Sequence, residues 1–327
     1  MSVAIYARLR AIRGAGAATM ALVLLLVLSA CAGPQTARFL TDASDLPFRS
    51  EVGGVPFFAQ TDNFCGPATL AMAATWAGTP LTQAEAAAQV FTPGKQGTLR
   101  DDMVAAARRN GLLAVPVTDM RALFQEIADG HPVIVFQNLA LDILPVWHYA
   151  VAYGYDLDRG VILLRSGLDE TRATPLDTFE RTWARGDHWG LVVLPAAGWP
   201  ATASERAVVE AAVGLELAGH GRAAGAVYAN AVQLWPEGYT AWFGLGNARY
   251  ATRDYRGSAE AFRQATRLRP NDAVAWNNLA YALAGNGRLP EAREAAEQAV
   301  RLAPLGGEGP YRDTLADINA LAARPAG

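Results

Sequence analysis

The chain has 327 residues, with 28 lysines and arginines against 31 aspartates and glutamates, which gives a formal net charge of −3. This mildly acidic balance offers no basic surface, so we expect no nucleic-acid binding. Two cysteines and four histidines are few for a cysteine-based metal site, and nothing in the sequence calls for a metal or an organic cofactor.

The first 30 residues predict an export signal. Three arginines and no acidic residue accompany the apolar run ATMALVLLLVLSA, which is too short and ends too abruptly for a membrane span. The run closes on Leu28-Ser29-Ala30-Cys31, which resembles the processing box of bacterial lipoproteins. The alternatives are an ordinary secretory peptide and an uncleaved anchor.

The lipoprotein resemblance implies a membrane-bound protein. Cys31 would become the acylated N-terminus, and residues 31–48 would tether the protein to the membrane. Ala32 follows where an inner-membrane retention signal resembles Asp, which favours the periplasmic face of the outer membrane. Removal of residues 1–30 takes the formal charge from −3 to −6. With Cys31 acylated, Cys65 has no partner for an intramolecular disulfide.

Residues 49–194 predict an α+β domain in which helices come first and an antiparallel sheet follows. The segment GVPFFAQ (54–60) predicts a strand that enters a loop. Apolar periodicity and turn residues then predict helices over 66–77, 82–91, 99–111 and 120–130. Alternating apolar segments predict strands over 131–139, 148–156, 160–167 and 188–195.

The C-terminal part predicts a helical repeat. A linker rich in proline, glycine and alanine (195–204) precedes it. Three residue types recur there at an interval of 34 residues: Pro236, Pro270 and Pro304; Trp242 and Trp276; Leu245 and Leu279. This period resembles the tetratricopeptide repeat, with three copies in 205–306 and a capping helix and tail in 307–327. Such arrays bind protein partners; the alternative is a structural buttress for the first domain.

Cys65 is the candidate nucleophile of the first domain. It stands at the predicted helix start, where the helix dipole lowers a thiol pKa. The base that a thiol nucleophile needs is best supplied by His148, which opens a strand with small residues at alternate positions. His188 is the competitor, while His131 lies at a turn and His220 in the repeats. A buried inert thiol is the alternative.

Gln60 is the candidate oxyanion donor. It lies five residues before Cys65, a distance at which its amide can fold back over the thiol. The alternative is an ordinary polar residue at the end of a strand.

The order of these motifs resembles a known family. Gln60, the run Cys65-Gly66-Pro67-Ala68, the segment GHPVIV and the segment HYAVAYGYD, which begins at His148, are similar to the C39 and C39-like cysteine peptidases. With the lipoprotein box and the repeats, the chain looks closest to the bacterial PA2778-family cysteine peptidases. The resemblance implies a papain-like fold over 49–194, with Cys65 as nucleophile, His148 as general base and then acid, and Gln60 as oxyanion donor.

The sequence departs from the C39 pattern at one position. The family places an Asp on the strand after the histidine strand, and Ser166 stands there instead. A hydroxyl accepts the imidazole N–H but does not stabilise imidazolium as a carboxylate does. Asp156 and Asp169 are nearby acids, so the third member of the site stays open, with Ser166 in the matching place.

Three functions remain open on the sequence. The first is a lipid-anchored periplasmic cysteine peptidase that acts on a peptide or protein and binds a partner through its repeats. The second is an inert papain-like scaffold in an envelope assembly. The third is an acyl transferase or transpeptidase that uses the same acyl-enzyme.

Overall fold

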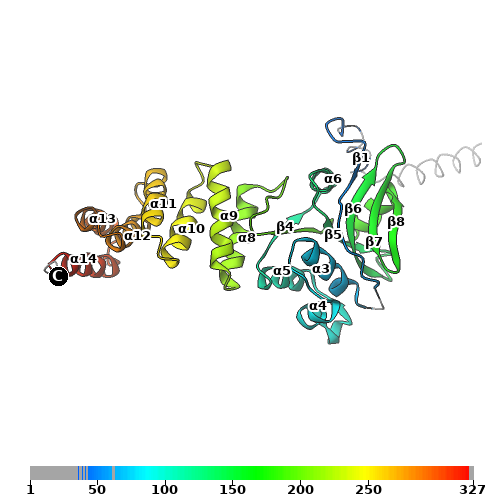
Figure 1. The fold of residues 1–327 in the computed structure, drawn as a ribbon, viewed down its shortest axis with the longest axis horizontal. Coiled ribbons are helices and arrows are strands. Elements are labelled where there is room, and N and C mark those ends of the chain that lie inside the picture. The colour runs from blue at the N-terminus through cyan, green and yellow to red at the C-terminus, as the bar shows by residue number, and fades with distance from the viewer. Residues whose placement is uncertain (1–35, 37–38, 40, 42, 61–62, 324–327) are drawn as a thin grey trace, which may run out of the picture.

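A computed structural model of the chain describes residues 36, 39, 41, 43–60 and 63–323 (Figure 1). The predicted export signal and Cys31 lie outside these residues. Within them, no helix is both long and apolar enough to span a membrane. Figure 1 shows a mixed domain built around a sheet, from which a row of helices extends to the C-terminal end.

The sheet of the first domain is antiparallel throughout, as expected. Its strands lie in the order β4-β9-β5-β6-β7-β8, and β1 pairs with the far end of β6. A separate hairpin joins β2 (Phe91–Thr92) to β3 (Gly97–Thr98). The strands of the main sheet are β1 (Arg49–Glu51), β4 (Leu112–Val117), β5 (Val133–Asn138), β6 (Trp147–Asp156), β7 (Val161–Ser166), β8 (Asp169–Pro175) and β9 (Gly190–Pro195).

The prediction of a strand over 54–60 was wrong. Two of the backbone groups in this segment bind elsewhere: Val55 O accepts from Arg165 Nη2 at 3.2 Å, and Gln60 N donates to Gly167 O at 2.9 Å. Strands β4 and β8 were not predicted. The first is a short apolar run, and the second is a polar edge strand whose residues are nearly all exposed.

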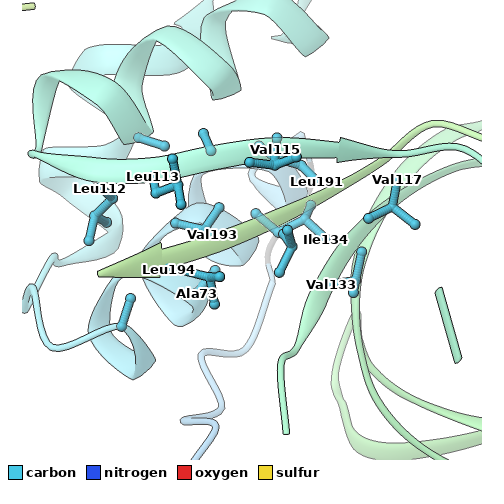
Figure 2. Packing of buried hydrophobic residues seen from close by; sticks show 14 of the residues in the cluster. Ala73, Leu112, Leu113, Val115, Val117, Val133, Ile134, Leu191, Val193 and Leu194 are labelled. Carbon is cyan, nitrogen blue, oxygen red and sulfur yellow. The ribbon is translucent and has the colours of Figure 1, made fainter. Parts of the chain in front are cut away.

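Between residues 63 and 194, the first domain contains five α-helices. They are α3 (Cys65–Trp76), α4 (Gln83–Val90), α5 (Arg100–Arg109), α6 (Met120–Ala128) and α7 (Leu176–Ala184). The first four confirm predicted helices, whereas α7 was not predicted. Helix α3 is buried on all sides from Gly66 to Ala74, and its alanines allow close packing against β6. Figure 2 shows Ala73 beside the aliphatic side chains of β4, β9 and β5.

The described part of the predicted tether packs on the domain. The ring of Phe39 lies 4.5 Å from that of Phe124 on α6, which in turn lies 4.7 Å from the ring of Tyr155. The backbone N–H of Thr36 donates to the buried carboxylate of Glu180 at 2.7 Å. Thr36 and Phe39 are therefore part of the folded domain, and the Phe39 side chain belongs to its core.

The C-terminal part forms three helix pairs and a final helix. These are α8 (Glu205–Leu217), α9 (Gly221–Leu234), α10 (Tyr239–Ala251), α11 (Tyr255–Leu268), α12 (Ala273–Gly285), α13 (Leu289–Leu302) and α14 (Gly309–Ala322). The repeated tryptophans have one shared role: Trp242 Nε1 donates to Pro236 O, and Trp276 Nε1 donates to Pro270 O, each at 2.8 Å.

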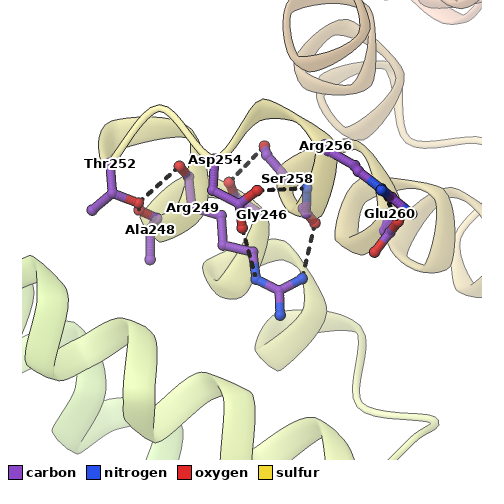
Figure 3. A network of polar contacts seen from close by, with 9 residues as sticks. Gly246, Ala248, Arg249, Thr252, Asp254, Arg256, Ser258 and Glu260 are labelled. Atoms are coloured by element: carbon purple, nitrogen blue, oxygen red, sulfur yellow. Dashed lines mark hydrogen bonds and ion pairs between the residues drawn. The ribbon is translucent and has the colours of Figure 1, made fainter. Parts of the chain in front are cut away.

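The turn between α10 and α11 shows how one pair closes (Figure 3). The side chain of Asp254 caps α11 by accepting from the N–H of Gly257 at 2.9 Å. Ser258 donates from Oγ to the carbonyl oxygen of Gly246 at 2.8 Å. A side chain at Gly246 would collide with Phe262, so the two helices approach each other only because this position is small.

The predicted linker is fixed between the two parts. Helix α8 packs on β4, and the buried carboxylate of Glu126 binds the linker. This carboxylate accepts from the N–H of Ala201 at 3.1 Å, from the N–H and Oγ1 of Thr202 at 2.9 and 2.7 Å, and from Nδ1 of His131 at 2.8 Å. Three hydrogen bonds from the linker to one buried carboxylate hold the array in a defined place, and the bond from His131 orients that carboxylate.

Candidate active site

Cys65 is the first residue of α3, as predicted, and its side chain is half-buried. The next residue, Gly66, faces the side chain of Thr98 on β3 so closely that a Cβ at position 66 would overlap it. The glycine therefore lets the β2–β3 hairpin close over the first turn of the helix.

The pKa of Cys65 is raised, contrary to the expectation from the helix N-terminus. Burial disfavours the thiolate and is the dominant effect. Hydrogen bonding from the backbone of Tyr149, Gly66 and Cys65 itself acts in the opposite direction. The contact with Tyr149 places the thiol beside the residue that follows His148 in β6.

His148 lies near the start of β6, opposite Gln137 of β5. Its Nε2 lies 2.9 Å from Oγ of Ser166, the last residue of β7. When Nε2–H donates to this hydroxyl, Nδ1 is left as the ring nitrogen that can take a proton. Among the described hydrogen bonds, none joins the Cys65 thiol to the imidazole.

The imidazole of His148 is held neutral. Burial lowers its pKa to about 4, and the positive charge of Arg172 on β8 acts in the same direction. The Ser166 hydroxyl does not counter this effect, because it carries no negative charge. The two pKa shifts thus favour a neutral thiol at Cys65 and a neutral imidazole at His148.

Gln60 is buried and tied to the turn that follows Ser166. Its backbone N–H donates to Gly167 O at 2.9 Å, and its Oε1 accepts from Gly167 N at 3.0 Å. Its Nε2 is buried and has no hydrogen-bond partner among the described residues. A buried amide N–H2 without a partner is unfavourable unless a ligand supplies the acceptor.

A series of contacts connects the four predicted site residues through their sequence neighbours. Cys65 contacts the backbone of Tyr149, the neighbouring His148 contacts Ser166, and the neighbouring Gly167 holds Gln60. The residues come from α3, β6, β7 and the segment before α3, so only the tertiary fold places them together.

Two family models match separate parts of the chain. Residues 52–188 match the model of the Peptidase_C39 like family, and residues 214–255 and 245–306 match that of the tetratricopeptide repeat. The chain carries a C39-like domain followed by tetratricopeptide repeats.

Solved structures resemble each part separately. A protein described as a C39-like peptidase from Bacillus anthracis is 18% identical, with 45% of this chain and 97% of that chain covered and a TM-score of 0.38. The Sgt2 repeat domain from Aspergillus fumigatus is 20% identical over 38% and 88% of the two chains, with a TM-score of 0.35. The first repeat domain of Spaghetti (RPAP3), bound to an HSP90 peptide, is 17% identical over 37% and 94%, with a TM-score of 0.34. No curated protein matches the sequence.

The other histidines of the chain have different surroundings. His188 lies in the turn before β9 with a positive φ of 49°, and its ring packs edge-on against Trp183. His131 donates to Glu126, and His220 donates from Nε2 to Arg109 O at 2.8 Å, where the repeat array meets the C39-like domain.

The nearby acids are engaged elsewhere. Asp156 lies at the opposite end of β6 from His148, accepts from the N–H of Arg159 and pairs with Arg49 at 3.2 Å. Asp169 is exposed and lies 3.8 Å from Arg172.

Two residues at the site were missed by the sequence analysis. Arg172 lies on the unpredicted strand β8, and its effect on His148 follows from the pairing of β8 with β7. Thr98 lies on the short strand β3, and its carbonyl oxygen accepts from the hydroxyl of Tyr149 at 3.2 Å. No local pattern marks either residue, because both act across strands that are distant in the sequence.

Proposed function

We propose that the protein is a lipid-anchored cysteine peptidase of the bacterial periplasm, which hydrolyses a peptide or related amide bond through Cys65 and His148. The observation that carries this proposal is the Nε2 of Gln60, which has no partner in the part of the chain that the structure describes, in a side chain that Gly167 fixes next to Ser166, the partner of His148. A donor held in this way matches the needs of an oxyanion.

The first half of the reaction forms an acyl-enzyme. The Sγ of Cys65 attacks the carbonyl carbon while its proton passes to Nδ1 of His148, and the oxyanion accepts from Gln60 Nε2 and the Cys65 N–H. The C–N bond then breaks, and His148 gives its proton to the leaving amine. Ser166 keeps Nε2 occupied, so that Nδ1 serves the thiol.

The second half releases the product. His148 takes a proton from water, whose oxygen attacks the thioester carbon. The C–S bond breaks, and the thiolate recovers the proton from His148. Since both groups are neutral at rest, the proton leaves the thiol during the attack and not before it.

The proposed location of the protein rests on its N-terminal sequence. The lipoprotein box at Cys31 supports anchoring at the periplasmic face of the outer membrane. The repeat array supports binding of a protein partner, since such arrays present extended surfaces to other chains.

A second candidate is a peptide-binding scaffold without catalysis. It is favoured by one observation: burial and Arg172 lower the pKa of His148 to about 4, without a carboxylate to hold imidazolium. A site of this kind binds a peptide but transfers protons poorly.

Hydrolysis and alkylation separate the two candidates. The full-length chain with Cys31→Ser keeps Cys65 as its only thiol. We expect it to cleave peptides from a casein digest, read by mass spectrometry, and expect Cys65→Ser and His148→Ala to abolish the products. Gln60→Glu keeps the acceptor for Gly167 but loses the donor, so hydrolysis should fall roughly 10²–10³-fold. Iodoacetamide alkylation forms no oxyanion, so it should fall much less, by no more than the added negative charge disfavours the thiolate.

The opposite result would favour the scaffold. It would consist of no cleavage by the unmodified site, together with an alkylation rate that is the same with and without His148.

A further inference from the structure

An apolar loop lies beside the candidate active site. The segment between β5 and β6 exposes large hydrophobic side chains to an unusual extent, with Ile143 at 80% and Leu144 at 74%. The whole set is Leu139, Leu141, Ile143, Leu144, Val146 and Trp147. Contiguous exposed apolar groups of this kind mark binding surfaces.

The loop is rigidly built. The buried side chain of Asn138 accepts through Oδ1 from the N–H of Ala140 at 3.1 Å and from that of Val146 at 2.9 Å. Its carbonyl oxygen accepts from the guanidinium of Arg185 at 3.0 Å. The apolar side chains are therefore held outward by an ordered backbone.

The loop is continuous with the catalytic contacts. Trp147 directly precedes His148, and its ring stacks on Phe136 at 5.1 Å. The ring of Phe136 lies 4.7 Å from that of Tyr149, whose backbone contacts the Cys65 thiol.

Two further exposed hydrophobic residues directly follow residues that contact the site. Leu99 (49% exposed) follows Thr98, which binds the Tyr149 hydroxyl, and Leu168 (77% exposed) follows Gly167, which binds Gln60. Exposed apolar side chains are thus sequence neighbours of site residues at three separate places along the chain.

Building on the proposed function, we propose that the substrate is a peptide with large apolar side chains next to the scissile bond, bound by the 139–147 loop together with Leu99 and Leu168. Burial of leucine or phenylalanine side chains against this surface would supply affinity without any charge. The loop contains a single charged residue, Asp142.

The placement of the loop favours a peptide over a lipid surface. The N-terminal segment packs through Phe39 and Phe124 near Tyr155, and Tyr155 lies eight residues along β6 from Trp147. Eight residues of strand span roughly 26 Å, so the described N-terminal residues lie at the far end of this strand from the loop. The loop also lacks the lysines and arginines that attach a surface loop to anionic lipid.

The test uses dipeptide amides that carry an iodoacetyl group, which alkylates the thiol of Cys65. The probes are N-iodoacetyl-leucyl-phenylalaninamide and N-iodoacetyl-seryl-asparaginamide, applied to the full-length chain with Cys31→Ser. We expect the leucyl-phenylalanine probe to alkylate Cys65 about tenfold faster or more than the seryl-asparagine probe, when each rate is divided by the rate for iodoacetamide with the same variant. Ile143→Ser with Leu144→Ser should reduce this preference several-fold. The matched control is Leu305→Ser with Val274→Ser, at exposed positions on the repeat array.

The outcomes separate this inference from the proposed function. Equal rates for the two probes, with peptide hydrolysis intact, would overturn the inference alone. A retained preference without hydrolysis would support the inference and remove the peptidase activity. If the Ile143 and Leu144 substitutions lowered binding to phosphatidylethanolamine–phosphatidylglycerol vesicles and left the preference unchanged, the loop would be a lipid contact and the inference would be wrong.

Discussion

Replacing Ser166 by aspartate should shift Cys65 and His148 from a neutral thiol and imidazole toward a thiolate and an imidazolium. The serine hydroxyl lies 2.9 Å from Nε2 of His148 and carries no charge. A carboxylate in its place would accept the same N–H and attract the proton on the ring. The substitution therefore raises the pKa of His148 and favours thiolate at Cys65.

The size of the effect follows from the surroundings of the imidazole. Burial and Arg172 hold the pKa of His148 at about 4. An adjacent opposite charge shifts a pKa by about 1–3 units, so Ser166→Asp should bring it to roughly 5–7. Two units correspond to about 2.7 kcal/mol and favour the ion pair over the neutral pair by about a hundredfold. Iodoacetamide alkylation of Cys65 at pH 6 should rise about tenfold or more.

The assay is an NMR titration of the His148 ring, with alkylation from pH 5 to 9 in parallel. Ser166→Asn is the matched control, since asparagine is similar in size to aspartate and carries no charge. Thermal unfolding verifies that each variant is folded, because Ser166 is buried. A folded Ser166→Asp protein whose His148 still titrates near 4 would refute the reasoning, as would an equal rise in the asparagine variant.

Three other predictions concern stability, measured by chemical denaturation. Gly66→Ala should destabilise the fold by about 1–3 kcal/mol through overlap with Thr98. A second change, Thr98→Ala, should restore most of this loss, because Thr98 Oγ1 makes no hydrogen bond among the described residues; no restoration would contradict the packing argument. Glu126→Gln should lose about 1–3 kcal/mol, since its amide N–H2 would face donors that now bind a carboxylate, and an unchanged midpoint would argue against this network. The folded pKa of His148, about 4, is below the ordinary 6.5, so unfolding takes up a proton between these values. Stability should thus be full above pH 6.5 and fall by roughly 3 kcal/mol toward pH 4; His148→Gln should flatten this slope, and an equal slope in both proteins would exclude His148 as its source.

Local sequence patterns were sufficient to predict features that depend on a single helix, strand or repeat. The helix start at Cys65 follows from Gly66, Pro67 and the helix formers after them, and α3 begins there. The apolar alternation of β6 predicted the strand that carries His148. The 34-residue period predicted the helix pairs, because each tryptophan repeats the same contact to a proline carbonyl.

The electrostatic surroundings of Cys65 could not be predicted from local sequence patterns. The helix N-terminus predicted a lowered pKa for Cys65, but burial beneath neighbouring segments outweighs it. That burial depends on contacts with β6 and on the β2–β3 hairpin over Gly66, and no sequence window contains both.

The sequence by itself determined which residue types occur and in what order: a cysteine at a helix start, a histidine opening a strand, a serine in the place of an acid, and a repeat of fixed period. These features depend on neighbours within a few positions, where backbone geometry is local. Only the tertiary structure decided that the amide N–H2 of Gln60 has no partner among the described residues, that the charge of Arg172 acts on the imidazole, and that the loop between β5 and β6 exposes apolar side chains. The reason is physical: solvation, charge and free hydrogen-bonding capacity depend on every segment packed around a group, and these segments come from distant parts of the chain.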